Sequence, residues 1–252
     1  MNKNKLTALC LAALLCCSVF AGCKGKPKNT ESDKATALPE GAVTAEVTPE
    51  EMQELIEQGV IPDPNADPED TKPQNVDPAP YTKGVVENNV YRNDACDLTL
   101  RIPTGWITQD DYNLCTLMGI TYNFEDPEAN LAEISKLADI YDLYITDINQ
   151  VSSIVVLMQD LNQHGMGDVD PSAYLESMKG QFTSETATFE IGDISKVSYS
   201  GNEYSMMKTV TTPNEGEEVT QYFFVREANE RMITVMMTSP TSDPINPDTI
   251  FA

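Results

Sequence analysis

The C-terminal third of the chain carries the pattern that most restricts its fold. Four segments rich in β-branched, aromatic and other apolar residues follow one another closely, at 195–200, 203–212, 217–227 and 230–238. Only short connections containing Gly, Asn or Pro separate them. Strands joined in this way are antiparallel neighbours, because a parallel connection needs about a dozen residues or more. The sequence therefore predicts a four-stranded antiparallel meander.

Methionine is concentrated in these four segments, at Met206, Met207, Met232, Met236 and Met237. Thioethers are ligands for soft metals such as Cu(I), so a copper site is one interpretation. Methionine also fills gaps in hydrophobic cores, and alternating positions on a meander place much of it inside. We expect these side chains to belong to the core.

The preceding part of the chain alternates between strand-like and helix-like patterns. Strands are predicted at 85–92, 98–102, 140–148 and 153–161. The run from Ile154 to Met158 is continuously apolar, which is typical of a central strand covered on both faces.

Three helices are predicted between these strands and the meander, over 109–118 and beginning at Asp126-Pro127 and at Asp170-Pro171. Their inward residues should be Leu114, Leu117 and Met118 in the first, Leu131, Ile134, Leu137 and Ala138 in the second, and Tyr174, Leu175, Met178 and Phe182 in the third. Strands grouped at one end, with helices interspersed earlier, indicate an α+β fold: a largely antiparallel sheet with helices packed on its faces.

Several motifs in this region resemble a known family. Tyr91 to Asn93, followed by Leu-Thr-Leu-Arg-Ile-Pro-Thr-Gly-Trp at 98–106, is similar to the opening of small bacterial lipoproteins with a PsbP/Mog1-like domain. The segments 141–144, 153–158, 160–162 and 172–175 continue the same pattern. The resemblance implies an α/β/α sandwich over a globular domain at 81–252. It implies no activity and transfers no site residue, since named relatives are assembly or adaptor proteins.

Residues 1–22 have the features of a bacterial lipoprotein signal peptide. Two lysines precede an apolar run at 6–20 that is short for a membrane span. The run leads into Val-Phe-Ala-Gly-Cys, which resembles a lipobox ending at Cys23. We predict that Cys23 is lipidated and holds the protein on the extracytoplasmic face of the cell membrane. The alternatives are an ordinary secreted protein cleaved nearby and an uncleaved anchor.

Residues 23–80 are predicted to form a flexible acidic tether. This stretch is poor in aromatic residues and contains nine prolines, so it cannot bury enough apolar surface to offset chain entropy. A short helix is expected near 49–58, between the capping box of Thr48 and Glu51 and the stop at Gly59. The acidic residues at 63–67 resemble a calcium loop, but the Gly and Glu that an EF-hand requires are missing, which favours a linker.

Only two of the six cysteines belong to the predicted domain. Three lie within the signal peptide and Cys23 is assigned to lipid, which leaves Cys96 and Cys115. Two thiols in an exported domain either form a disulfide or pack as small buried hydrophobes, and both alternatives stay open. No Cys/His spacing supports a zinc site.

The charge balance excludes some classes of partner. The chain carries 40 acidic against 16 basic residues, a formal net charge of -24. The domain itself has 27 acidic and nine basic residues between 81 and 252. Such a balance argues against binding nucleic acid or an anionic lipid surface through a broad electrostatic footprint.

No residue pattern in the chain defines a catalytic site. The single histidine, His164, lies in a Gly-flanked loop without a nucleophile motif nearby. Ser205 and Lys208 match a Ser-x-x-Lys motif, but the segment is strand-like and no Lys-Thr-Gly follows. We therefore expect no cofactor and a non-catalytic binding or adaptor module for another envelope protein. The alternatives are an envelope hydrolase with a carboxylate-based site and a weak divalent-cation binder.

Overall fold

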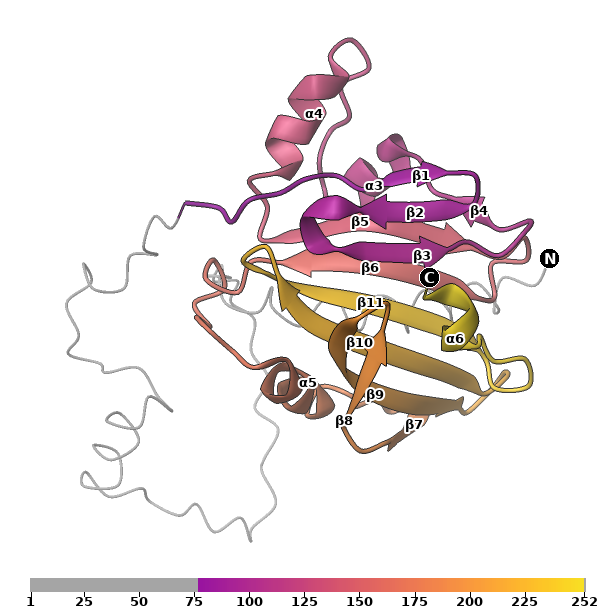
Figure 1. Cartoon of the computed structure of the whole chain (residues 1–252). Coiled ribbons are helices and arrows are strands. Elements are labelled where there is room, and N and C mark those ends of the chain that lie inside the picture. The colour runs from indigo at the N-terminus through magenta and orange to yellow at the C-terminus, as the bar shows by residue number, and fades with distance from the viewer. Residues whose placement is uncertain (1–76, 252) are drawn as a thin grey trace, which may run out of the picture. The chain divides into compact units, whose positions relative to one another are not determined.

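The computed structural model describes residues 77–251, whose strands form two antiparallel sheets (Figure 1). The predicted signal peptide, Cys23 and the tether up to residue 76, including the helix near 49–58 and the acidic stretch at 63–67, lie outside the described residues. Within 77–251, no helix is long and apolar enough to cross a lipid bilayer.

The larger sheet has the strand order β4-β5-β6-β11-β10-β9-β7, and β8 pairs with β9 beside this path. Its strands are β4 (Ile107–Thr108), β5 (Asp139–Thr146), β6 (Ser153–Gln159), β7 (Ala187–Ile191), β8 (Ser195–Tyr199), β9 (Asn202–Pro213), β10 (Val219–Ala228) and β11 (Arg231–Pro240). Strands β8 to β11 are consecutive antiparallel neighbours, so the predicted meander is confirmed. Strand β6 is buried along its whole length, as its apolar run predicts.

The outer edge of β9 is shared by two short strands. β8 pairs with its first part and β7 with its last part. Between them, the Gly192 N–H donates to the Lys208 carbonyl oxygen at 2.8 Å. A side chain at Gly192 would place its Cβ 3.0 Å from that oxygen, so the close approach favours glycine. Strand β7 has no counterpart among the strands predicted from the sequence.

The smaller sheet consists of β1 (Val85–Glu87), β2 (Val90–Asn93) and β3 (Leu98–Arg101). The prediction of a single strand over 85–92 is wrong, because the chain reverses at Asn88-Asn89. Both residues have positive φ, 51° and 60°. This conformation is that of a two-residue hairpin turn, and asparagine tolerates it better than most residues do.

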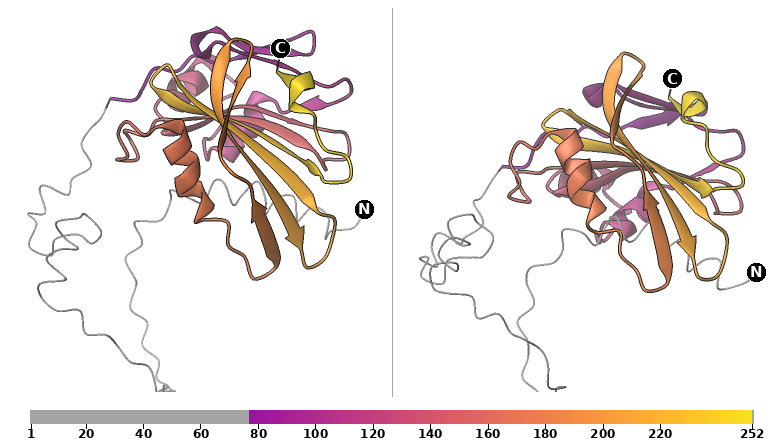
Figure 2. Two further views of the ribbon diagram at one scale, coloured as in Figure 1. Left: turned by 60° about the horizontal axis from the view of Figure 1, so that its bottom comes forward. Right: turned by 90° about the horizontal axis from the view of Figure 1, so that it is seen from below.

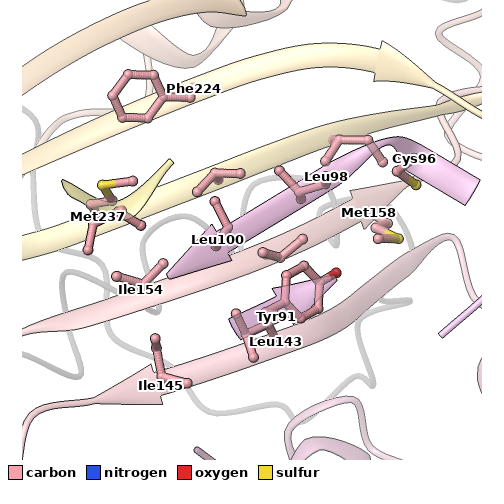
Figure 3. Packing of buried hydrophobic residues seen from close by; sticks show 14 of the residues in the cluster. Tyr91, Cys96, Leu98, Leu100, Leu143, Ile145, Ile154, Met158, Phe224 and Met237 are labelled. Carbon is pink, nitrogen blue, oxygen red and sulfur yellow. The ribbon is translucent and has the colours of Figure 1, made fainter. Parts of the chain in front are cut away.

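The smaller sheet covers one face of the larger sheet. Figure 3 shows Tyr91, Leu98 and Leu100 in one buried cluster with side chains of the larger sheet, among them Ile145, Ile154 and Met237. Helix α5 (Pro171–Lys179) packs on the opposite face (Figure 2). Successive side chains of β10 point to opposite faces of the larger sheet. Phe223 packs in the cluster under α5, and Phe224 packs in the cluster under the smaller sheet. The predicted α+β class with a largely antiparallel sheet is confirmed; the β-sheet layer over one face was not predicted.

The remaining helices are short and begin at capping residues. They are α3 (Asp111–Leu117), α4 (Pro127–Ile134) and α6 (Pro247–Ile250), and a 3-10 turn spans Asp94–Cys96. The predicted starts at Asp126-Pro127 and Asp170-Pro171 are confirmed, and each Asp side chain accepts a hydrogen bond from the first helical turn. The expectation that Leu117 and Leu131 point inward is wrong, because both are exposed.

Candidate interaction surface

An exposed group of aromatic side chains, the aromatic cluster, is formed by Tyr112 of α3 and by Tyr122 and Phe124 in the loop before α4. The rings of Tyr112 and Phe124 stack with centroids 5.7 Å apart, and Tyr122 meets Phe124 edge-on at 4.9 Å. Phe124 is 73% exposed and Tyr112 is 48% exposed. Isolated exposed apolar residues are ordinary, whereas contiguous exposed apolar patches are typical of interaction surfaces.

The loop that carries Phe124 is held in place by the buried side chain of Asn130. The Asn130 amide accepts from the Asn123 N–H at 2.7 Å and donates to the Asn123 carbonyl oxygen at 2.9 Å. The Asn123 side chain in turn accepts from the N–H groups of Glu125 and Asp126. These side-chain-to-backbone bonds fix the peptide on both sides of Phe124, so the ring is displayed by a structured loop.

The helices beneath the aromatic cluster are attached to the core of the larger sheet. Cys115 of α3 and Ile134 of α4 are buried in the core, and Tyr122 packs partly against it. Lys83 forms an ion pair with Asp111 at the start of α3. In Figure 1, α4 and the loop leading into it extend beyond the β5 edge of the sheet. The aromatic cluster therefore lies on a projection that is attached to the sheet through α3 and the end of α4.

Carboxylates flank the aromatic cluster along the chain and form an acidic rim: Asp110, Asp111, Glu125, Asp126 and Glu128, all of them exposed. Asp110 and Asp126 cap α3 and α4, which accounts for their presence structurally. Glu125 and Glu128 cap neither helix. Among the described residues, the ion pair of Asp111 with Lys83 is the one salt bridge that the rim makes.

A second notable region is the strap, defined as residues 79–84, which leads into β1. Buried Asp160 accepts a hydrogen bond from the Ala79 N–H at 2.8 Å. Burial alone would raise the pKa of Asp160, but this bond and those from Gln163 outweigh it and lower the pKa. Asp160 therefore remains a carboxylate whose charge is balanced by backbone and amide donors.

Arg231 holds the same part of the strap from the other side. Its guanidinium is almost fully buried and donates to the carbonyl oxygens of Ala79 at 2.7 Å and Pro80 at 3.1 Å. It also donates to the Leu137 carbonyl oxygen at 3.2 Å. Burial lowers the pKa of Arg231, while nearby Asp160 opposes that change. A buried cation whose donors are satisfied by backbone carbonyl groups acts as a structural clamp.

Asp142 is the third buried charge that meets the strap. It is the extra residue of a β-bulge in β5, which turns its carboxylate toward the smaller sheet. The carboxylate accepts from the hydroxyls of Tyr81 and Tyr91 and from the Gly84 N–H. Burial, followed by the Asp142 charge, raises the pKa of both tyrosines well above the usual range, so they remain protonated donors.

His164 pairs with a carboxylate at the start of β5. Its Nε2 lies 3.0 Å from Asp139 Oδ1, and Gln159 donates to the same oxygen at 2.7 Å. The hydrogen bond to Asp139 raises the pKa of His164, and burial only partly opposes the shift. Burial would raise the pKa of Asp139, but the hydrogen bonds from His164 and Gln159 lower it. The contact therefore favours the charged form of each partner.

A pocket of about 240 Å³ lies between the loop at 161–169 and the β10–β11 turn. Three carboxylates line it, those of Asp168, Glu227 and Glu230. Nowhere in residues 77–251 are three or more His, Cys, Asp or Glu side chains grouped so that they could hold a metal ion. The carboxylates of this pocket therefore line it without converging on one point.

The residues singled out in the sequence are dispersed in the structure. Cys96 and Cys115 are both free and buried in the structure. Of the two alternatives, a disulfide or two buried thiols, the structure therefore has the buried thiols. Burial raises the pKa of Cys96 to about 11 and also raises that of Cys115, which keeps both as unreactive thiols at neutral pH. Ser205 is buried on β9 whereas Lys208 of the same strand is exposed, so they form no catalytic pair.

The methionines of the meander are core residues, as expected. Met207, Met232 and Met236 pack on the α5 side, Met237 packs on the other side, and Met206 is partly buried against the core. The aromatic cluster and the strap were not predicted. The closely spaced aromatics at 112, 122 and 124 were a signal for the former, but their exposure depends on tertiary packing.

The likeness found between this chain and known proteins is one of structure. No protein-family model matches it, and no curated protein matches it. Among solved structures, it is similar to the cyanobacterial PsbP protein (CyanoP) of Synechocystis sp. PCC 6803, with 10% identity and a TM-score of 0.33 over 65% of this chain and 87% of that chain. The α+β class described above rests on the strands and helices themselves.

Proposed function

We propose that this protein is a membrane-anchored extracytoplasmic lipoprotein that acts as a non-catalytic binding or adaptor module for another envelope protein. The lipid anchor is assigned to Cys23 from the lipobox-like sequence, and the PsbP/Mog1-like identity of the domain is proposed from the motifs at 91–106. The predicted tether would give the domain reach from the membrane.

The observation that carries the binding role is the aromatic cluster. A ring that is 73% exposed costs solubility, and here a loop with side-chain-to-backbone bonds at Asn123 and Asn130 presents it. Aromatic residues are enriched at the centres of protein interfaces, where large rigid side chains bury area at low entropic cost. The proposal therefore places the partner on the projection formed by α3, α4 and the loop between them.

The binding role is tested by comparing two surface variants of the full chain. Phe124→Ser removes an exposed ring, and Ile148→Ser removes a side chain of similar exposure, 75%, in a different turn. With a photoreactive side chain at Thr121, Phe124→Ser should abolish the cross-link to an envelope protein and Ile148→Ser should keep it. The control position for the photoreactive side chain is Asn149, next to Ile148. If the cross-link at Thr121 is no stronger than the one at Asn149, the proposal is rejected.

The anchor is tested separately with Cys23→Ala. The variant should leave the membrane fraction and appear in the soluble extracytoplasmic fraction, because it lacks the acylated residue. A control variant, Cys96→Ser, keeps the proposed lipidation site and should stay with membranes. Retention of Cys23→Ala in the membrane fraction would reject the anchor assignment.

A further inference from the structure

We propose that the aromatic cluster and its acidic rim recognise a cationic segment of the partner protein, one that presents Lys or Arg side chains to the rings. This inference rests on the proposed binding function and adds the chemistry of the partner. Its components are the faces of Tyr112 and Phe124 and the carboxylates of the rim.

The rings provide the first half of the recognition. The face of an aromatic ring attracts an ammonium or guanidinium group, and the aliphatic stem of Lys or Arg packs on the same surface. Tyr112 and Phe124 stack with an interplanar angle of 30°, so together they offer one extended apolar surface. Phe124 is the most exposed of the three rings, so much of its surface outside the contacts with Tyr112 and Tyr122 is open to such a side chain.

Charge complementarity provides the second half. Between residues 107 and 138, the chain has six acidic side chains and one basic side chain. The basic one, Lys136, is paired with Glu133 on α4, and Lys83 from the strap pairs with Asp111. The remaining rim carboxylates thus give the projection a negative field that steers a positive partner toward the rings.

The negative charge of the acidic rim disfavours two other binding partners, a second copy of this chain and an anionic lipid surface. A second copy of this chain would bring its own surplus of acidic residues, 27 against nine in the domain, against the rim. An anionic lipid surface would be repelled for the same reason. A cationic protein segment is the occupant that gains from both the rings and the carboxylates.

The direct experiment uses three twelve-residue peptides, in which Ser alternates with Lys, with Arg or with Glu. They are titrated into the mature chain while the ring signals of Tyr112 and Phe124 are followed by NMR. We expect the Lys and Arg peptides to bind at least about 10-fold more tightly than the Glu peptide. Raising the salt from about 50 to about 500 mM should weaken them by about 10-fold, because the rim is exposed.

Paired variants separate local recognition from net charge. Glu125→Gln combined with Glu128→Gln should weaken binding of the Lys peptide by about 5-fold, and Phe124→Ser should do the same. The control pair, Glu185→Gln with Glu215→Gln, removes the same charge from two exposed sites near the other edge of the sheet and should have little effect. An equal loss in the control pair, or equal binding of the Glu peptide, would overturn the inference.

The cross-linking assay at Thr121 distinguishes failure of the inference from failure of the proposed function. A Phe124-dependent cross-link that persists at high salt and in the Glu125→Gln, Glu128→Gln chain would keep the binding function and overturn the cationic partner. A Phe124-dependent cross-link to a second copy, or Phe124-dependent binding to zwitterionic vesicles, would also overturn it. Loss of every Phe124-dependent cross-link would reject the binding function itself.

Discussion

The pair of His164 with Asp139 makes stability depend on pH at the scale of single residues. The raised pKa of His164 means that its contribution is complete below the unfolded value of 6.5 and is lost as the pH rises through the folded pKa. The lowered pKa of Asp139 means that its contribution is complete above 3.8 and is lost as the pH falls through the folded pKa. The pair therefore contributes most to the free energy of unfolding between about pH 3.8 and pH 6.5.

We expect His164→Asn to destabilise the protein most between about pH 4 and 6.5, and progressively less at higher pH. The maximum should be about 1 kcal/mol or less, because Asp139 is partly exposed and water screens the charges. Urea unfolding of both proteins at several pH values measures the difference. A difference that grows steadily above pH 7 would contradict the assigned pKa directions.

Among the substitutions considered, we expect that of Arg231 to lower the free energy of unfolding most. Arg231→Met removes the donors to the carbonyl oxygens of Ala79, Pro80 and Leu137 and leaves Asp160 buried without the nearby cation. Breaking a buried charged network of this kind costs about 3–5 kcal/mol. The free energy of unfolding measured with urea should fall by that amount. The exposed Arg92→Met is the control, with an expected change within about 0.5 kcal/mol; similar losses in the two variants would contradict the clamp.

At the scale of elements, the loop before α4 depends on one buried amide. Asn130→Ala removes both bonds to the Asn123 backbone, and the expected loss is about 1 kcal/mol because the N–H and C=O of Asn123 lose their part-buried partner. Hydrogen exchange should accelerate at Asn123 while β6 stays protected. Asn113→Ala, on the exposed side of α3, is the control. Unchanged exchange at Asn123 would show that the loop does not need Asn130.

The elements also show which features sequence patterns can predict. Helix starts at Asp126 and Asp170 and the strands β8 to β11 depend on local capping and turn chemistry, which the sequence contains. The outward position of Leu131 depends on where α4 lies relative to the sheet, which periodicity alone does not determine. The aromatic cluster was missed for the same reason, since its residues have the composition of a core.

At the scale of the whole molecule, the strap unites parts of the fold that are distant in sequence. Asp160 follows β6, Arg231 begins β11 and Asp142 lies in β5, yet all three bond to residues 79–84. Local patterns cannot predict such a junction, because Ala79 and Pro80 have the composition of the acidic tether before them. Each charge is buried, and each takes part of its compensation from the strap.

The domain should therefore be less stable without the strap. A chain that begins at Asp77 retains all partners of the three buried charges, whereas a chain that begins at Val85 loses those that the strap supplies. We expect the shorter chain to melt at least about 10 °C lower by circular dichroism, because several kcal/mol of compensation is removed from a domain of marginal stability. The control is Pro78→Ala, which alters a neighbouring exposed residue without removing a strap contact. Equal melting temperatures for the Asp77 and Val85 chains would mean that water satisfies Asp142, Asp160 and Arg231 once the strap is gone, and that the domain begins at β1.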